Sequence, residues 1–338
     1  MSIKKNKIAI YLDLNIYRHL IEKRKNWHFI QDKINFLHKR GFIFPYSPAH
    51  MEEIALICQK TDIDNHVEKI TQHLNIIKQI SKNHEYLPGI PTASEIDNVI
   101  MWYASENCSI SKELIQELEV RKQEWRSGLL TESDRETRLT REVPEVCFYR
   151  VCRDANMSEF ALKNDAKLIS RRTKSKAKVI LEELSIPYDE TLYAFDEIRT
   201  KYGINSEMIN NVPIQTFFQQ PSVLKLAQDL YSLDLNAINK GVDFIKIHSY
   251  KEEIIEKLFN ILEICGYKKD KQCDVIKIRS RMHDITHAIY GSSAKYFVTD
   301  DEKFSQRLRL IYHFLDLPII IQDSNSFISC DFSKKTSA

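Results

Sequence analysis

The sequence predicts an α/β protein with a central parallel sheet, interrupted by a long and mainly helical insertion. Strand and helix patterns alternate at the start of the chain, the same alternation returns near its end, and helical periodicity fills the region between them. The chain has 338 residues, of which 43% are hydrophobic, so it can bury a large core. With only 7 Gly and 9 Pro, an all-β protein built on tight turns is disfavoured.

The N-terminal segment, 1–61, follows the order strand, helix, strand, helix. Residues 7–12 are apolar and β-branched, as in a buried parallel strand, and a long helical stretch with a break near Asn26 follows. The segment 42–46 predicts a second short strand. Ser47 is a suitable N-cap and Pro48 suits the first helical position, so we expect a helix to begin there.

The middle of the chain, residues 62–271, is expected to be mainly helical. Apolar side chains recur there at helical spacing, and Leu74, Ile77 and Ile80 mark one such face. The loops that we expect to separate these helices cover residues 86–93, 127–134, 185–189 and 203–221.

The alternation of strand and helix then returns. The segment DVIKIRSRMHDITHAIYG predicts a helix that Gly291 closes at the C′ position, and EKFSQRLRLIYHFL predicts another helix between the strands KYFVTDD and LPIIIQD. We therefore expect three parts: a discontinuous core formed by residues 1–61 and 272–330, a helical insertion over 62–271, and a flexible tail over 331–338.

Charge and cysteine content exclude several classes of protein. The 49 Lys and Arg against 47 Asp and Glu leave a net charge of +2, so the whole chain is not a basic nucleic-acid clamp. No Gly-rich phosphate loop of an NTPase or a dinucleotide enzyme occurs. The odd number of Cys, 7, the lack of CxxC and the absence of a leader-like apolar start predict a cytoplasmic protein with reduced thiols. No apolar run is long enough to cross a membrane.

Acidic residues follow the predicted strands or lie on the helices beside them. Asp13 ends the first strand, and Asp300 and Asp301 end the strand YFVTDD. The other acids of this set are Glu52 and Glu53 on the helix after Pro48, and Asp284 on the helix that ends near Gly291. The carboxyl ends of parallel strands share one edge of a sheet, where carboxylates repel one another unless a cation neutralises them. Oxygen ligands without a thiolate favour one or two Mg²⁺ or Mn²⁺ ions.

These segments resemble the PIN domain family. The resemblance is carried by IYLDLNIY, SPAHMEEIA and DITHAIYGSSAKYFVTDD with the KF that follows, and it covers about residues 1–60 and 275–325. PIN domains are three-layer α/β/α nucleases, mostly ribonucleases, with three or four acids that bind Mg²⁺ or Mn²⁺. The resemblance implies that the catalytic metal ligands are Asp13, Glu53, Asp284 and Asp301, with Glu52 and Asp300 as further candidates. The family's connection between its second and third acids is short, whereas the long insertion separates Glu53 from Asp284 here.

Three polar residues near these acids have expected supporting roles: Asn15, Thr299 and His287. Each also has a simpler interpretation, since Thr299 could cap the next helix and His287 could be a packed histidine. For Asp13 the simpler interpretation is a cap of the following helix, and for Asp284 an exposed acid paired with a neighbour. Candidates for binding nucleic acid are Arg279 and Arg281 near Asp284, and Arg171, Arg172 and Lys174 in the basic segment 163–178, which could equally be a solvated helix face.

The sequence thus predicts a metal-dependent nuclease that hydrolyses phosphodiester bonds, with single-stranded or structured RNA favoured over DNA as its substrate. The resemblance also suggests a toxin or defence effector with an inhibitor or antitoxin protein as partner, and a homo-oligomer is compatible with it. Two alternatives stay open. One is a structure-specific DNA nuclease, and the other is an inactive PIN-like module that binds RNA or a partner protein.

Overall fold

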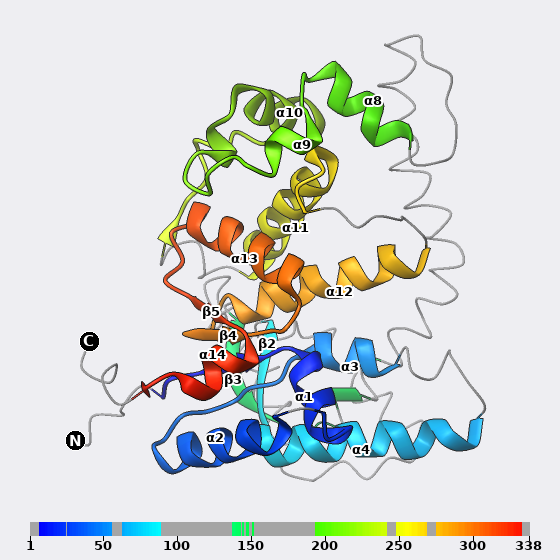
Figure 1. Ribbon diagram of the computed structural model, residues 1–338, viewed down its shortest axis with the longest axis vertical. Helices are drawn as coiled ribbons and strands as arrows, with labels where there is room; N and C mark the ends of the chain where they lie inside the picture. The colour runs from blue at the N-terminus through cyan, green and yellow to red at the C-terminus, as the bar shows by residue number, and fades with distance from the viewer. Residues whose placement is uncertain are drawn as a thin grey trace, which may run out of the picture.

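The computed structural model (Figure 1) describes most of both ends of the chain and part of its middle. The described residues are 7–24, 26–55, 63–88, 137–142, 193–241, 248–268 and 275–332, together with 144, 147, 148 and 151.

A three-stranded parallel sheet lies at the centre of this structure, in the order β1-β4-β5. Strand β1 (Ile10–Leu12) pairs with β4 (Tyr296–Val298), and β4 pairs with β5 (Ile320–Gln322). The start of the chain therefore lies beside a strand that comes from near its end. The expectation of a mixed α/β fold whose parallel sheet joins both ends of the chain is confirmed.

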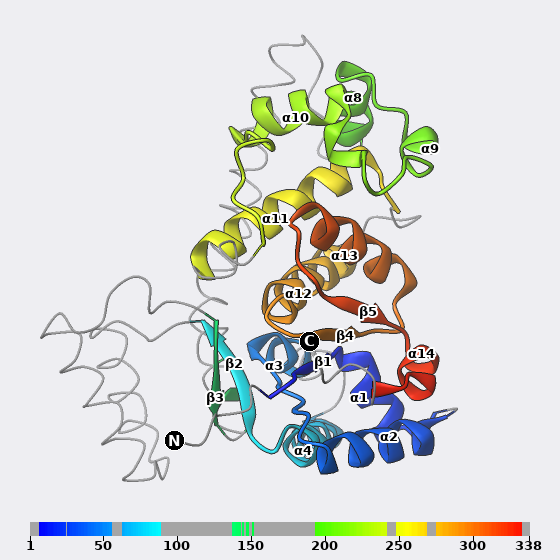
Figure 2. The same ribbon diagram turned by 90° about the vertical axis from the view of Figure 1, so that its left-hand side faces the viewer.

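Helices cover both faces of this sheet. Neighbouring strand residues point to opposite sides, so each strand contributes side chains to the core on both faces. Ile10, Leu12 and Val298 face one hydrophobic cluster, while Tyr11 and Phe297 face another. The first cluster includes helices α1 (Leu14–Ile21), α2 (Trp27–Lys39), α4 (Ile63–Ser81) and α14 (Ser324–Ser329). The second includes α11 (His248–Cys265), α12 (Val275–Gly291) and α13 (Glu302–Phe314). Figure 2 shows the sheet between these two sets of helices.

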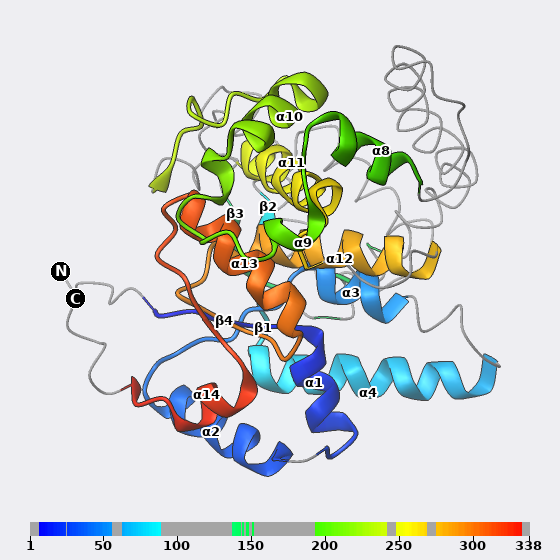
Figure 3. The same cartoon turned by 45° about the horizontal axis from the view of Figure 1, so that its top comes forward.

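The described middle of the chain adds a two-stranded antiparallel sheet and a group of helices. Strands β2 (His84–Pro88) and β3 (Thr137–Arg141) pair antiparallel. Helices α8 (Tyr193–Lys201), α9 (Ser206–Ile209) and α10 (Pro221–Tyr231), with the 3₁₀ turn Phe217–Gln219, gather around α11 on the side away from the sheet (Figures 1 and 3). Helix α3 (Pro48–Ala55) packs against α12, which is the contact that brings the two ends of the chain together around the candidate site.

Several predicted elements are confirmed. The break near Asn26 separates α1 from α2, and Asn26 adopts a left-handed conformation with φ 70°. A helix begins at Pro48, and the face formed by Leu74, Ile77 and Ile80 on α4 is buried. Helix α13 covers almost the whole predicted segment.

The expectation of a mainly helical middle is wrong at β2 and β3. Residues 86–88, predicted as the start of a loop, belong to β2, and the predicted loop 203–221 contains α9 and a 3₁₀ turn. The predicted loops 127–134 and 185–189 lie outside the described residues. The sequence did not predict the pairing of β2 with β3, because these strands are far apart along the chain and no short turn joins them.

Two local predictions need correction. The segment 42–46 forms isolated bridges instead of a strand, one from Ile43 to Ala9 and one from Tyr46 to Glu85, because Pro45 lacks the N–H that a continued ladder requires. Gly291 is the last residue of α12, and its φ is not left-handed. A Cβ at this position would lie 2.3 Å from ring carbons of Phe297, so the glycine allows α12 to pack closely on β4.

The expected tail over 331–338 is described only at its first two residues, and the rest lies outside the described part. Phe332 is buried against Phe42 and Tyr296. In the described helices, no stretch is both long and apolar enough to traverse a bilayer.

Candidate metal centre

Asp13 follows β1 directly and lies at the carboxyl edge of the sheet. Its side chain does not cap α1, and the residue is only 5% exposed. The carboxylate instead accepts hydrogen bonds from Thr299 Oγ1 at 2.6 Å and Asn15 Nδ2 at 3.2 Å. Burial and the negative charge of Glu53 outweigh the attraction of His287, so the pKa of Asp13 is raised. The capping interpretation therefore does not describe the role of this side chain.

Glu53 projects from α3 toward Asp13. Its Oε2 lies 3.2 Å from Arg18 Nη2, and its Oε1 lies 2.9 Å from His287 Nε2. Although burial alone would raise the pKa of Glu53, the hydrogen bond from His287 and the positive charges of His287 and Arg18 lower it to about 2. Glu53 is therefore ionised at neutral pH.

His287 lies on α12, one turn after Asp284, and is fully buried. Its Nε2 faces Glu53 Oε1 at 2.9 Å and Asp13 Oδ1 at 4.0 Å. Burial disfavours the charged imidazole, but the hydrogen bond to Glu53 and the charges of Glu53 and Asp13 raise the pKa of His287. His287 thus has direct contact with the acidic cluster and is more than a packing residue.

Asp284 faces the same cluster from α12. Burial raises its pKa well above its ordinary value, and the negative charges of Asp13, Asp301 and Glu53 add to this effect. Within the described part of the chain, its carboxylate has no hydrogen-bond or ion-pair partner. Of the two neighbours considered as its partner, His287 makes no ion pair with it, and the side chain of Arg281 lies outside the described residues.

The two acids after β4 have different surroundings. Asp301 is close enough to raise the pKa of Asp284, but its carboxylate also caps α13 by accepting a hydrogen bond from Phe304 N at 2.8 Å. Asp300 lies in another network, where its Oδ2 is 2.8 Å from His19 Nε2 and its Oδ1 accepts from Ser324 N at 2.7 Å. Of this pair, only Asp301 acts on the cluster.

Glu52 lies beside the cluster but outside its centre. Its Oε2 is 3.4 Å from His283 Nδ1, and its side chain is 36% exposed. The backbone of Arg279 and Arg281 belongs to α12, while their side chains lie outside the described residues. The basic residues Arg171, Arg172 and Lys174 also lie outside the described part of the chain.

Thr299 and Asn15, two of the residues expected to have supporting roles, both donate hydrogen bonds to the Asp13 carboxylate. Thr299 is 1% exposed, and its hydroxyl donates to Asp13 Oδ2 while it accepts from Asp301 N at 3.1 Å. Asn15 is itself held by Arg18, whose Nη1 donates to Asn15 Oδ1 at 3.3 Å. Thr299 is therefore not the helix cap, because Asp301 has that role.

A buried chain of hydrogen bonds behind His287 was not predicted. Tyr11 OH lies 2.8 Å from His287 Nδ1 and 2.6 Å from Ser47 Oγ, and Ser47 N donates to His50 Nδ1 at 3.1 Å. His50 Nε2 lies 2.7 Å from the carbonyl oxygen of Leu12. Burial lowers the pKa of His50 to about 3, so this ring is neutral. The spacing of Ser47 and His50 resembles a capping box with histidine in place of Glu, which was the available sequence signal.

The donor set fits a divalent cation. Ligand atoms of Asp13, Glu53 and His287 lie within 4.8 Å of one another. When ionised, the carboxylates of Asp13, Glu53, Asp284 and Asp301 carry four negative charges, and Arg18 offsets one of them. A divalent ion would offset two more, and so weaken the repulsion that adds to the effect of burial on the pKa of Asp284.

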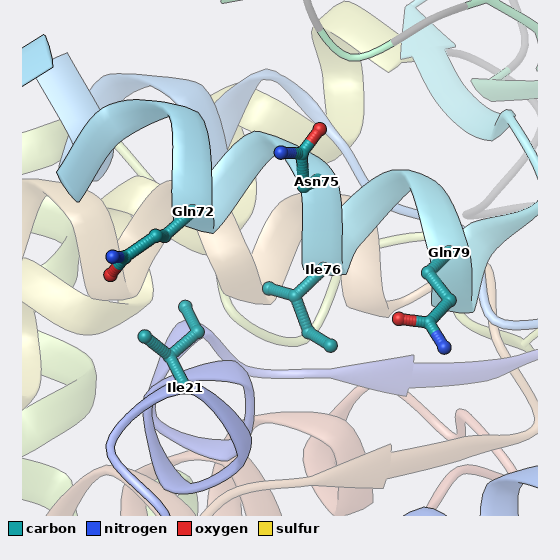
Figure 4. A pocket seen from close by; sticks show the side chains of 5 residues that line it. All are labelled: Ile21, Gln72, Asn75, Ile76 and Gln79. Atoms are coloured by element: carbon teal, nitrogen blue, oxygen red, sulfur yellow. The ribbon is translucent and has the colours of Figure 1, made fainter. Parts of the chain in front are cut away.

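A separate hollow lies between α1 and α4, away from this cluster (Figure 4). It is lined by Ile21 from α1 and by Gln72, Asn75, Ile76 and Gln79 from one face of α4. These lining residues carry no ionisable group, so the hollow offers none of the chemistry of the acidic cluster.

No family model, curated protein or solved structure matches this chain.

Proposed function

We propose that this protein is a PIN-like, metal-dependent nuclease that hydrolyses phosphodiester bonds in RNA. The observation that carries the proposal is the convergence of Asp13, Glu53 and Asp284 at the carboxyl edge of the parallel sheet, from opposite ends of the chain. The order and context of these acids are those of the PIN motifs. The proposal includes a PIN-like topology for the mixed α/β fold and its small parallel sheet.

Asp13, Glu53, Asp284 and Asp301 would hold one or two Mg²⁺ or Mn²⁺ ions. Such an ion supplies Lewis acidity, which activates water and neutralises charge on the phosphate. In the net reaction water adds to phosphorus, one P–O ester bond breaks, and the leaving oxygen takes up a proton. Arg18, Thr299 and Asn15 keep Glu53 on α3 and Asp13 after β1 in fixed positions, so that little reorganisation is needed when substrate binds.

A divalent ion held by the cluster would favour a phosphodiester substrate over a neutral one. Carboxylates repel a polyanion unless a metal ion lies between them, and the ion then bridges the acids and the phosphate. RNA is preferred over DNA on the basis of the PIN resemblance. A toxin or defence role, with an inhibitor protein as partner, would follow from the same resemblance.

The test is cleavage of labelled single-stranded RNA, duplex DNA and flapped DNA by the full chain with Mg²⁺ or Mn²⁺. We expect metal-dependent RNA cleavage that Asp13→Asn removes while its circular dichroism spectrum stays unchanged. Asp300→Asn is the matched control, because this acid lies after the same sheet but its carboxylate binds His19 and Ser324. It should retain nearly full activity.

Each outcome separates the candidate functions. Cleavage of flapped DNA alone would identify a structure-specific DNA nuclease. RNA binding without cleavage under any metal condition would support an inactive binding module. Full activity of Asp13→Asn would overturn the assignment of the site.

A further inference from the structure

His287 presents a ring nitrogen to the carboxylates of the site. We propose that His287 Nε2 is itself a ligand of the divalent ion, together with Asp13 and Glu53, so that the site prefers a transition-metal dication such as Mn²⁺ or Co²⁺ over Mg²⁺. The inference deepens the proposed function, since it concerns the ion of that same site, but it does not depend on cleavage activity.

The distances around Nε2 suit one shared ion. In an octahedral site with bonds of about 2.1 Å, neighbouring ligand atoms lie about 3.0 Å apart and opposite ones about 4.2 Å apart. Nε2 lies 2.9 Å from Glu53 Oε1 and 4.0 Å from Asp13 Oδ1, and one ligand atom from each of the three residues lies within 4.8 Å of the others. An ion can therefore contact all three after small side-chain movements.

A second observation points to a cation at the same place. The Asp284 carboxylate has no hydrogen-bond or ion-pair partner in the described chain, although it lies among the charges of Asp13, Glu53 and Asp301. Arg18 is already engaged by Glu53 and Asn15, and Arg307 by Glu263 at 3.2 Å. A bound dication would offset the negative charges of Asp13, Asp301 and Glu53 that add to the raised pKa of Asp284.

The hydrogen-bond chain behind His287 holds the ring in a suitable orientation. His50 Nδ1 accepts from Ser47 N, so the proton of the neutral ring is on Nε2, which donates to the Leu12 carbonyl. The Ser47 hydroxyl can then donate to His50 Nδ1 at 3.3 Å, and Tyr11 OH can donate to Ser47 Oγ at 2.6 Å. In this arrangement the Tyr11 oxygen accepts from His287 Nδ1–H at 2.8 Å.

The distances allow this arrangement, in which Nδ1 carries a proton and Nε2 is the ring nitrogen that can serve as a metal ligand. Histidines that bind metals usually donate their other ring N–H to a fixed acceptor, and here that acceptor is the Tyr11 oxygen. Without an ion, Nε2–H donates to Glu53 Oε1 at 2.9 Å. His287 would release this proton to solvent when Nε2 serves as a ligand.

A nitrogen ligand changes the choice of metal. Mg²⁺ prefers oxygen ligands and gives up its water reluctantly, whereas imidazole binds first-row transition metals well. A site with two carboxylates and one imidazole therefore favours Mn²⁺ or Co²⁺. The four acids alone would show no such preference for nitrogen-binding metals.

The decisive experiment is pulsed electron paramagnetic resonance of Mn²⁺ bound to the full chain, prepared with natural and with ¹⁵N-labelled histidine. We expect a nitrogen coupling that changes on labelling and disappears in His287→Gln. By calorimetric titration, His287→Gln should lose about 10–100-fold in Mn²⁺ and Co²⁺ affinity and only a few-fold in Mg²⁺ affinity. His283→Gln is the matched control, because His283 lies one turn earlier on α12 and contacts Glu52 instead. It should keep the coupling.

Tyr11→Phe is a second variant that should disturb folding less than His287→Gln, because it removes only the hydroxyl that orients His287. We expect it to keep the nitrogen coupling but to lower Mn²⁺ affinity about 10-fold. Bound Mn²⁺ without a histidine coupling in the wild-type protein would overturn this inference, and the nuclease proposal would stand if RNA were still cleaved. If Mn²⁺ showed the histidine coupling but no substrate were cleaved, the inference about His287 would stand and the nuclease proposal would fail. If no divalent ion binds, both proposals fail.

Discussion

Replacing Thr299 by Val tests how the protein holds its most buried carboxylate. Thr299 Oγ1 donates to Asp13 Oδ2 at 2.6 Å and accepts from Asp301 N at 3.1 Å, and the residue is 1% exposed. Valine has nearly the same shape but lacks the hydroxyl. A hydrogen bond to a charged group contributes about 1.5–3 kcal/mol, and the second, neutral bond contributes about 1 kcal/mol. The added methyl group returns up to about 1 kcal/mol by burial.

We therefore expect Thr299→Val to lower the free energy of unfolding by about 1.5–4 kcal/mol at pH 7 without divalent ions, as measured by denaturant titration. Because the carboxylate would lose its fixed orientation, Mn²⁺ affinity should fall about 10–100-fold in calorimetry. Thr299→Ser retains the hydroxyl and is the control, with a loss of about 1 kcal/mol for the missing methyl group. If the Val and Ser variants were equally stable and both bound Mn²⁺ like the wild type, the reasoning about this hydroxyl would be refuted.

Three further predictions concern the neighbouring residues. Asp284→Asn should raise the free energy of unfolding at pH 7 by about 1–3 kcal/mol without divalent ions, because burial and the charges of Asp13, Asp301 and Glu53 disfavour the ionised carboxylate. It should also weaken Mn²⁺ binding, and a destabilised variant in denaturant titration would contradict this prediction. Wild-type stability falls as pH rises above the ordinary Asp value toward the raised pKa, so the gain should shrink below pH 4. Glu53→Gln should have the opposite pH dependence. Since its folded pKa is about 2, ionised Glu53 stabilises the protein fully above its unfolded pKa near 4.5, and denaturation at pH 7 and pH 3 should show the larger loss at pH 7. Gly291→Ala should cost about 1–3 kcal/mol despite its better helix propensity, because the new Cβ would lie 2.3 Å from the buried Phe297 ring, and thermal unfolding that matches the wild type would argue against this packing.

Much of the candidate site could be predicted from the sequence, because the ends of parallel strands share one edge of a sheet. Asp13 follows β1, Asp301 follows β4, and Asp284 and His287 lie one turn apart on one helical face. The choice of Glu53 over Glu52 depends on which side of α3 faces α12, which a helix register alone does not decide. Asp300 and Asp301 differ for a similar reason, since adjacent residues after a strand point in different directions.

The rest depended on contacts between distant segments. Tyr11 in KIAIYL looks like a packing residue, and its hydroxyl gains meaning only when α12 lies behind β1 with His287 at 2.8 Å. Arg18 has no local signal that connects it with Glu53. Likewise, the reason for glycine at 291 is the ring of Phe297, which lies on another element, so a sequence rule for helix ends suggested the wrong cause.

The hydrogen bond from Thr299 to Asp13 joins residues that are 286 positions apart. A ribosome that adds about 5–20 residues per second needs roughly 15–60 s to make the intervening chain. During that interval the nascent protein holds Asp13 and Glu53 without their partners from α12 and β4. On the proposed function, cleavage that needs the full set of acids is thus withheld from the messenger and ribosome until residue 301 has been added, and a chain that terminates before Asp284 never acquires it.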